Sequence, residues 1–171
     1  LQQERRLTAA ERGTAMHLVM QYLELGGPDP EEQVRRLTDR RLLPPQQAEA
    51  VDKERIRAFL ATPLAQEIRQ ARQVWREYRF ALLLPAAPYD PAAEGEELML
   101  PGVVDCAFRT EEGRVVVDFK TDRLAPGEEP QRAEEYRPQL EAYAQALERV
   151  MEEKVCRKVL YFFSTGATIN L

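Results

Sequence analysis

The sequence predicts an α/β protein in which a mixed β-sheet is flanked by helices, behind a mostly helical N-terminal portion. In residues 1–74, helix-capping residues stand beside apolar residues at helical spacing. Residues 75–171 contain strand-like runs of aliphatic and aromatic residues separated by turn residues. Near the end, a strand, a helix and another strand follow one another, which favours a parallel crossover. We therefore expect one domain over 1–171.

The N-terminal portion is expected to form four helices. The first, at about 9–25, begins after Thr8, which forms a capping-box pattern with Glu11. Its apolar residues recur at helical spacing until Gly26-Gly27-Pro28 ends the run. The other three are expected at 31–42, 46–60 and 63–73.

The remaining residues are expected to form the sheet and one long helix. Residues 114–120 contain a continuous valine run, as in a strand covered on both faces. Residues 85–95 contain three prolines and predict a loop, and 111–113 predict a turn. The other predicted elements are a strand at 75–84, one strand or a broken pair at 98–108, a charged loop at 121–134, a helix at 135–151 and a final strand at 155–164.

The charge of the chain argues against binding of nucleic acid by bulk electrostatics. The 171 residues include 24 basic and 29 acidic ones, for a net charge of −5. Local basic faces at 35–41 and 69–79 are candidates for such binding, with a solvated helix face as the plainer alternative.

The two cysteines, Cys106 and Cys156, exclude a disulfide scaffold, a four-cysteine zinc site and an iron–sulfur cluster supplied by this chain alone. No apolar run reaches the length of a membrane span. The first residues are polar and lack a starting Met, so we expect a cytoplasmic piece of a longer protein.

Two acidic residues in consecutive predicted strands carry the strongest chemical signal. Asp105 ends the sequence Gly-Val-Val-Asp, and Asp118 is followed two residues later by Lys120. Since alternate strand residues share a face, Asp118 and Lys120 project together, and the turn at 111–113 can bring Asp105 beside them. Two carboxylates and an ammonium suit hydrolysis assisted by Mg²⁺ or Mn²⁺. A purely structural Asp–Lys ion pair is the alternative at this stage.

Other residues are ordinary when each is taken alone. His17 is the only histidine, and a lone histidine is more often a core or surface residue than a metal ligand. Gln139 and Tyr143 are four residues apart and so share one face of the predicted helix.

Taken together, five short motifs in this order resemble the RecB-type nucleases of the PD-(D/E)xK superfamily, most closely the nuclease domains of the AddA type. Each motif is weak alone, and the strand motif lacks a proline that is frequent in the family. The motifs are Gly13-Thr14-Ala15-Met16-His17, Glu77-Tyr78-Arg79-Phe80, Gly102-Val103-Val104-Asp105, Asp118-Phe119-Lys120-Thr121-Asp122 and Gln139-Leu140-Glu141-Ala142-Tyr143.

The resemblance implies a restriction-endonuclease-like fold and a role for each matching residue. His17, Asp105, Asp118 and the backbone carbonyl of Phe119 would bind the metal, with Lys120 as the catalytic lysine. Three further residues would contact DNA or support the site: Gln139, Tyr143 and Glu77.

The resemblance also implies a substrate and partners. The chain would be a Mg²⁺-dependent exonuclease, with Mn²⁺ as the alternative metal, acting on the 3′-ended strand of single-stranded DNA during break repair. A helicase in the same polypeptide and an AddB-like subunit would be its partners, and bacterial cytoplasm its location. Because a helicase would deliver the DNA, we expect the isolated chain to bind DNA weakly without metal. The other function considered is a non-catalytic module of the same fold that guides DNA or docks onto a partner.

Overall fold

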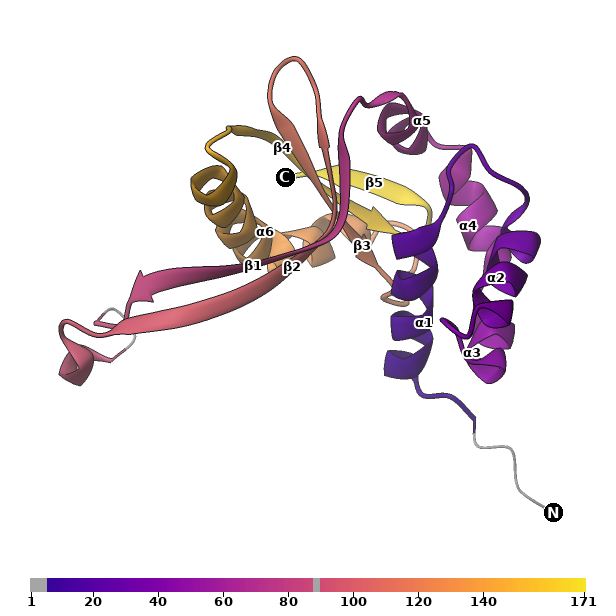
Figure 1. Ribbon diagram of the computed structural model, residues 1–171, viewed down its shortest axis with the longest axis horizontal. Helices are drawn as coiled ribbons and strands as arrows, with labels where there is room; N and C mark the ends of the chain where they lie inside the picture. Colours follow the sequence, from indigo (N-terminus) through magenta and orange to yellow (C-terminus); the bar gives the residue numbers. More distant parts are fainter. Residues whose placement is uncertain (1–5, 88–89) are drawn as a thin grey trace.

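The computed structural model describes residues 6–87 and 90–171, and its centre is one mixed sheet (Figure 1). The five strands lie in chain order. Neighbouring strands are antiparallel except for the third and fourth, which are parallel. The strands are β1 (Val74–Pro85), β2 (Glu97–Arg109), β3 (Arg114–Lys120), β4 (Val155–Phe162) and β5 (Ala167–Asn170). The mixed sheet flanked by helices is therefore confirmed, and the short β5 was not predicted.

The helix α6 (Glu129–Met151) joins the parallel strands β3 and β4, which confirms the predicted crossover. The prediction that residues 121–134 form a loop was wrong from Glu129 onward. Glu129 is buried, while the other charged residues of the first turns are exposed or half-buried, and Pro130 stands in the first turn, where a missing N–H costs nothing. The helix also continues through Pro138.

The helices of the N-terminal portion are α1 (Ala9–Tyr22), α2 (Pro30–Asp39), α3 (Pro45–Ala50), α4 (Lys53–Leu60) and α5 (Pro63–Gln70). The capping box of Thr8 and Glu11 starts α1 as predicted. The single helix predicted at 46–60 was wrong, because Asp52 accepts a hydrogen bond from the Arg55 N–H at 3.1 Å and begins a new helix. A short 3₁₀ turn, Pro91–Ala93, lies within the predicted 85–95 loop, of which residues 88–89 fall outside the described part. No described helix is long and apolar enough to cross a membrane.

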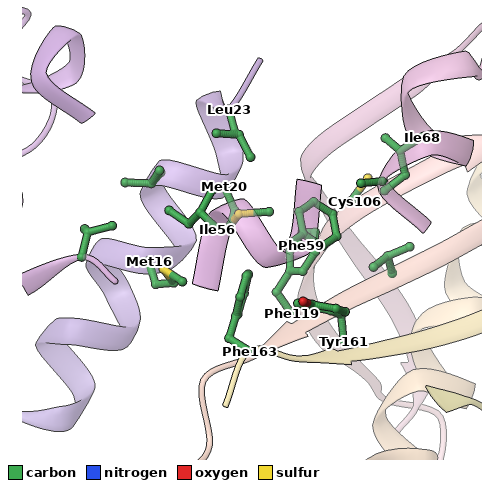
Figure 2. Packing of buried hydrophobic residues seen from close by; sticks show 14 of the residues in the cluster. Met16, Met20, Leu23, Ile56, Phe59, Ile68, Cys106, Phe119, Tyr161 and Phe163 are labelled. Atoms are coloured by element: carbon green, nitrogen blue, oxygen red, sulfur yellow. The ribbon is translucent and has the colours of Figure 1, made fainter. Parts of the chain in front are cut away.

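Both faces of the central strands are buried, as the valine run predicted. On one face, α1 and α4 pack against β3 and β4 (Figure 2). The ring centroid of Phe59, on α4, lies 4.9 Å from that of Tyr161 and 5.3 Å from that of Phe119. On the other face, α6 places Leu140 and Leu147 against the sheet. The edge-to-face aromatic contacts hold α4 against β3 and β4, and buried apolar residues of α1 pack into the same cluster.

β1 and β2 extend beyond the rest of the sheet as a long two-stranded arm (Figure 1). Near its base, Gly102 faces Phe80 across the two strands, and a Cβ atom built on Gly102 would lie 2.2 Å from the Phe80 ring. Glycine is therefore required where the ring crosses the backbone. This contact gives a physical reason for the glycine and the phenylalanine of two of the motifs.

Candidate active site

The first two candidate residues meet where β2 and β3 separate. The hydrogen-bonded ladder between these strands ends at the pair Cys106 and Val117. Asp105 and Asp118 are the next residue on each strand, so they leave the ladder together. Instead of a ladder bond, the Phe119 N–H donates to Asp105 Oδ2 at 2.8 Å. The two carboxylates are thus brought side by side at the end of the sheet.

α1 adds His17 to this point. Its Nε2 lies 2.9 Å from the carbonyl oxygen of Phe119 and 3.3 Å from Asp105 Oδ2. Its Nδ1 lies 2.9 Å from the carbonyl oxygen of Gly13. Both ring nitrogens therefore face acceptors, which favours the doubly protonated ring. The hydrogen bond to Asp105, opposed by burial, raises the pKa of His17 to about 9.

The second carboxylate lies beside the lysine. Lys120 Nζ is 2.6 Å from Asp118 Oδ2, as expected for alternate residues of one strand. Burial and the neighbouring Asp105 carboxylate raise the pKa of Asp118 to about 7, although Lys120 acts in the opposite direction. Burial also acts to raise the pKa of Asp105, but hydrogen bonds involving His17 and Asp118 lower it below its usual value. The two carboxyl groups therefore differ in acidity, and as the pH rises Asp105 loses its proton before Asp118.

α6 supplies the next neighbours of Lys120. Lys120 Nζ donates to Gln139 Oε1 at 3.3 Å, and Gln139 Nε2 donates to the Tyr143 hydroxyl at 3.1 Å. The Tyr143 ring contacts Phe80 edge-on, with ring centroids 5.5 Å apart. Gln139 and Tyr143 thus adjoin the site, and Tyr143 ties it to the base of the β1–β2 arm.

Glu77 is a predicted site residue whose carboxylate forms no described bond with the other site residues. It is half-buried in β1, and no described hydrogen bond or ion pair joins its carboxylate to the site. Its φ of 48° lies in the left-handed region, which is uncommon for a residue other than glycine. It lies beside the position of Asp105 in the strand register, where neither residue takes part in the ladder. Its backbone conformation therefore locally interrupts β1 next to the site.

Two residues that sequence reasoning left without a role also belong to the site. The Tyr136 hydroxyl donates to both carboxylate oxygens of Asp122, at 2.9 and 3.0 Å. Its ring lies under the ammonium of Lys120, with Nζ 3.7 Å from the ring centroid. Tyr136, Gln139 and Tyr143 are spaced i, i+3 and i+7, a polar and aromatic stripe on one helix face that could have revealed this role.

The glycine of the first motif allows α1 to approach the end of β3. A Cβ atom built on Gly13 would lie 3.0 Å from Thr121 Oγ1, so there is no room for a larger side chain without movement. The close approach places His17, one turn further along the helix, against the Phe119 carbonyl.

Replacing Gly13 by valine is expected to destabilise the protein by about 1–3 kcal/mol through overpacking at this contact. Urea unfolding measures the effect. The control is Ala10→Val, which adds the same side chain at an exposed position of α1 and should cost less than about 1 kcal/mol. Equal effects of the two substitutions would contradict the proposed role of the close approach.

The donor set suits a divalent cation. Once His17 releases its Nε2 proton, an imidazole nitrogen, two carboxylates and a main-chain carbonyl converge, and oxygen-rich sets of this kind favour Mg²⁺ or Mn²⁺. Asp118 Oδ2 is buried and lies 2.6 Å from the Lys120 ammonium, so this carboxylate faces the same point as the other donors. Within residues 6–87 and 90–171, no three His, Cys, Asp or Glu side chains are already arranged as a metal cluster. Instead, His17 and Lys120 place positive charge against the two carboxylates.

Comparisons with known proteins identify the family of this chain. A family model described as the PD-(D/E)XK nuclease superfamily matches residues 1–169. A relative from Acetivibrio thermocellus, named as the A subunit of an ATP-dependent helicase/nuclease, is 42% identical and covers 99% of this chain. A relative of the same name from Heliobacterium modesticaldum is 40% identical and covers all of it. The chain spans only 14% and 13% of the length of these two relatives. With its two carboxylates and lysine at the sheet end and a family match over nearly its whole length, the chain belongs to the PD-(D/E)XK nuclease superfamily.

Proposed function

We propose that this chain is the nuclease domain of a longer helicase–nuclease and hydrolyses single-stranded DNA exonucleolytically with Mg²⁺. The observation that carries the proposal is the convergence of His17 Nε2, Asp105 Oδ2 and the Phe119 carbonyl beside the Asp118–Lys120 pair. The relatives support the helicase part, because their name describes a helicase and a nuclease in one polypeptide. By this resemblance an AddB-like protein would be the partner, in break repair at the bacterial nucleoid.

Each residue of the candidate active site would have its own role in phosphodiester hydrolysis. His17, Asp105, Asp118 and the Phe119 carbonyl would hold the cation, which would polarise the phosphodiester and lower the pKa of a bound water. Lys120 would orient the attacking water and stabilise charge that develops on the phosphate oxygens. Gln139, which accepts a hydrogen bond from Lys120, would restrict the position of the ammonium, and Tyr143 would hold Gln139. Glu77 would act from outside the metal-binding set, by shaping the backbone beside Asp105.

The proposal is tested by incubating the chain with end-labelled single-stranded DNA in Mg²⁺, Mn²⁺, Ca²⁺ or EDTA. We expect cleavage in Mg²⁺ or Mn²⁺ and none in EDTA, with products shortened from one end. Labels at the 3′ and 5′ ends in separate reactions show which end is degraded. Cleavage of a closed single-stranded circle would contradict the exonucleolytic part alone. Unchanged cleavage in EDTA would contradict metal-dependent hydrolysis itself.

Tyr136 is expected to position Lys120 for the reaction. Tyr136→Leu removes the aromatic ring beneath the Lys120 ammonium and with it the cation–π contact. Such a contact contributes about 0.5–2 kcal/mol, so its loss is expected to lower kcat by roughly 2- to 30-fold. Tyr136→Phe keeps the ring and loses only the hydrogen bond to Asp122, so its kcat should lie nearer the wild-type value.

Steady-state cleavage assays compare these two variants with Tyr22→Leu, which removes an exposed tyrosine far from Lys120 in the sequence. The positioning role would be wrong if Tyr136→Phe and Tyr136→Leu lowered kcat equally.

A further inference from the structure

A cleft of about 900 Å³ opens beside the candidate active site. Its walls come from α1, from the junction of α3 and α4, and from the segment that follows β3, with Tyr136 of α6 and two residues after β4, Phe163 and Ser164. His17, Phe119 and Lys120 form part of its wall, so it begins at the reacting centre. Gln139 and Tyr143 are not among the described residues that line it. The cleft therefore leaves the site on the α1 side, away from the pair for which a DNA contact was predicted.

The lining of this cleft is basic, although the chain as a whole is acidic. Its charged lining residues comprise four basic and two acidic ones, apart from His17, while the chain carries a net charge of −5. Both acidic residues already have partners within the protein. Asp52 pairs with Arg55 at 3.1 Å, and Asp122 shares the proton of the Tyr136 hydroxyl between its two oxygens and pairs with Arg132, outside the lining, at 3.9 Å. Neither carboxylate is therefore free to compensate the other cations of the cleft.

Within residues 6–87 and 90–171, two arginines of the lining have no acidic partner. The side chain of Arg12, on α1, donates to the carbonyl oxygen of Leu7 at 3.1 Å and pairs with no described carboxylate, so no described acidic group compensates its charge. Arg123, on the segment after β3, is exposed and forms no ion pair or side-chain hydrogen bond within the described part of the chain. Two uncompensated guanidinium groups from different walls of one cleft are suited to phosphate groups, which they can bind by paired hydrogen bonds.

We propose that this cleft binds the sugar–phosphate backbone of single-stranded DNA next to the cleaved bond, with Arg12 and Arg123 each contacting a phosphate. This inference rests on the proposed nuclease function and adds the path of the strand. The contacts are sequence-independent, since they involve the backbone alone. These contacts also explain how a protein with a net negative charge can bind polyanionic DNA, because the electrostatic attraction is confined to one basic cleft.

The test is the salt dependence of binding, measured by the fluorescence anisotropy of a labelled single-stranded oligonucleotide in EDTA at low salt. Each phosphate contact contributes a slope of about −0.7 to the plot of log K against log salt. We expect Arg12→Ala and Arg123→Ala each to make the slope shallower by about that amount and to weaken binding. Arg12→Lys and Arg123→Lys keep the charge and should restore most of the slope. Arg35→Ala, at an exposed arginine of α2 outside the cleft, should leave it unchanged.

Two results would overturn the proposal. One is a wild-type slope in both cleft variants, and the other is no measurable binding by the wild type even at the lowest salt. Because the assay contains no metal, it is independent of catalysis. Suppose that the two alanine variants have shallower slopes but the wild type cleaves no DNA: the proposed function is then refuted, and the proposed role of the cleft stands. If the wild type cleaves DNA and both variants keep its slope, only the role of the cleft is refuted.

Discussion

Replacing Asp118 by asparagine is expected to abolish DNA cleavage and at the same time to stabilise the metal-free protein. Loss of cleavage follows because the neutral amide of asparagine cannot supply a charged ligand. Substitutions that only support a metal ligand already cost about 10- to 100-fold, so losing a ligand should cost at least 100-fold. The gain in stability follows because the Asp118 carboxylate is buried beside Asp105, an arrangement that favours its neutral form.

The effect of Asp118→Asn on stability depends on pH with a definite sign. The pKa of Asp118 is about 7 in the folded protein, against 3.8 for the ordinary group. Below about pH 4 the carboxyl is protonated in both states and contributes no difference. As pH rises toward 7, the unfolded chain releases the proton first, so the wild type loses stability. Since one pKa unit corresponds to 1.36 kcal/mol, the variant should be more stable by about 2–4 kcal/mol at pH 8.

Urea unfolding in EDTA at pH 5 and pH 8 measures this difference. The control is Asp39→Asn, which neutralises an exposed carboxylate of α2 and should change stability little at either pH. If the ion pair with Lys120 outweighed burial and the repulsion from Asp105, removing Asp118 would instead destabilise the protein by about 3–5 kcal/mol. A less stable Asp118→Asn variant at pH 8 would therefore contradict the raised pKa of Asp118, whereas the cleavage assay decides between an active site and a structural ion pair.

The sequence was sufficient to predict the carboxylate pair but not its link to His17. Strand periodicity and a short turn are local rules, and they correctly placed Asp105, Asp118 and Lys120 together. His17 contacts a carbonyl 102 residues away in the sequence. No local rule predicts such a contact, because it depends on how closely α1 approaches β3 at Gly13 and Thr121. Only the resemblance of the five motifs suggested it.

The errors in the predicted elements have similar physical causes. The predicted ends of α1, α2 and α5 were each three residues too late, since the sequence patterns do not show where the backbone leaves the helix. At Leu23 and Ala71 the backbone turns extended, and at Arg41 φ becomes positive. The start of α6 was missed because only Glu129 and Ala133 are buried in its first two turns, and a glutamate and an alanine do not form a recognisable apolar period. Tertiary contacts and solvation, rather than local pattern, decide these boundaries.

Replacing His17 by alanine is expected to weaken Mn²⁺ binding by at least about 100-fold and to abolish cleavage, while the chain stays folded. The fold should persist because α1 remains anchored through Met16, Val19 and Met20, which are almost fully buried. Removal of the hydrogen bonds of His17 should still lower the free energy of unfolding by about 1–3 kcal/mol.

Calorimetric titration with Mn²⁺ and urea unfolding together separate the two roles of His17. Thr14→Ala is the matched control, because Thr14 lies on the same helix and is exposed, and within the described part of the chain its hydroxyl donates only to the Ala10 carbonyl of its own helix. It should leave Mn²⁺ affinity unchanged. A His17→Ala variant that lost stability but bound Mn²⁺ as tightly as the wild type would show that the histidine fastens α1 to the sheet without being a ligand. Because the ring contacts both the Phe119 carbonyl and Asp105, a true ligand must change affinity and stability together.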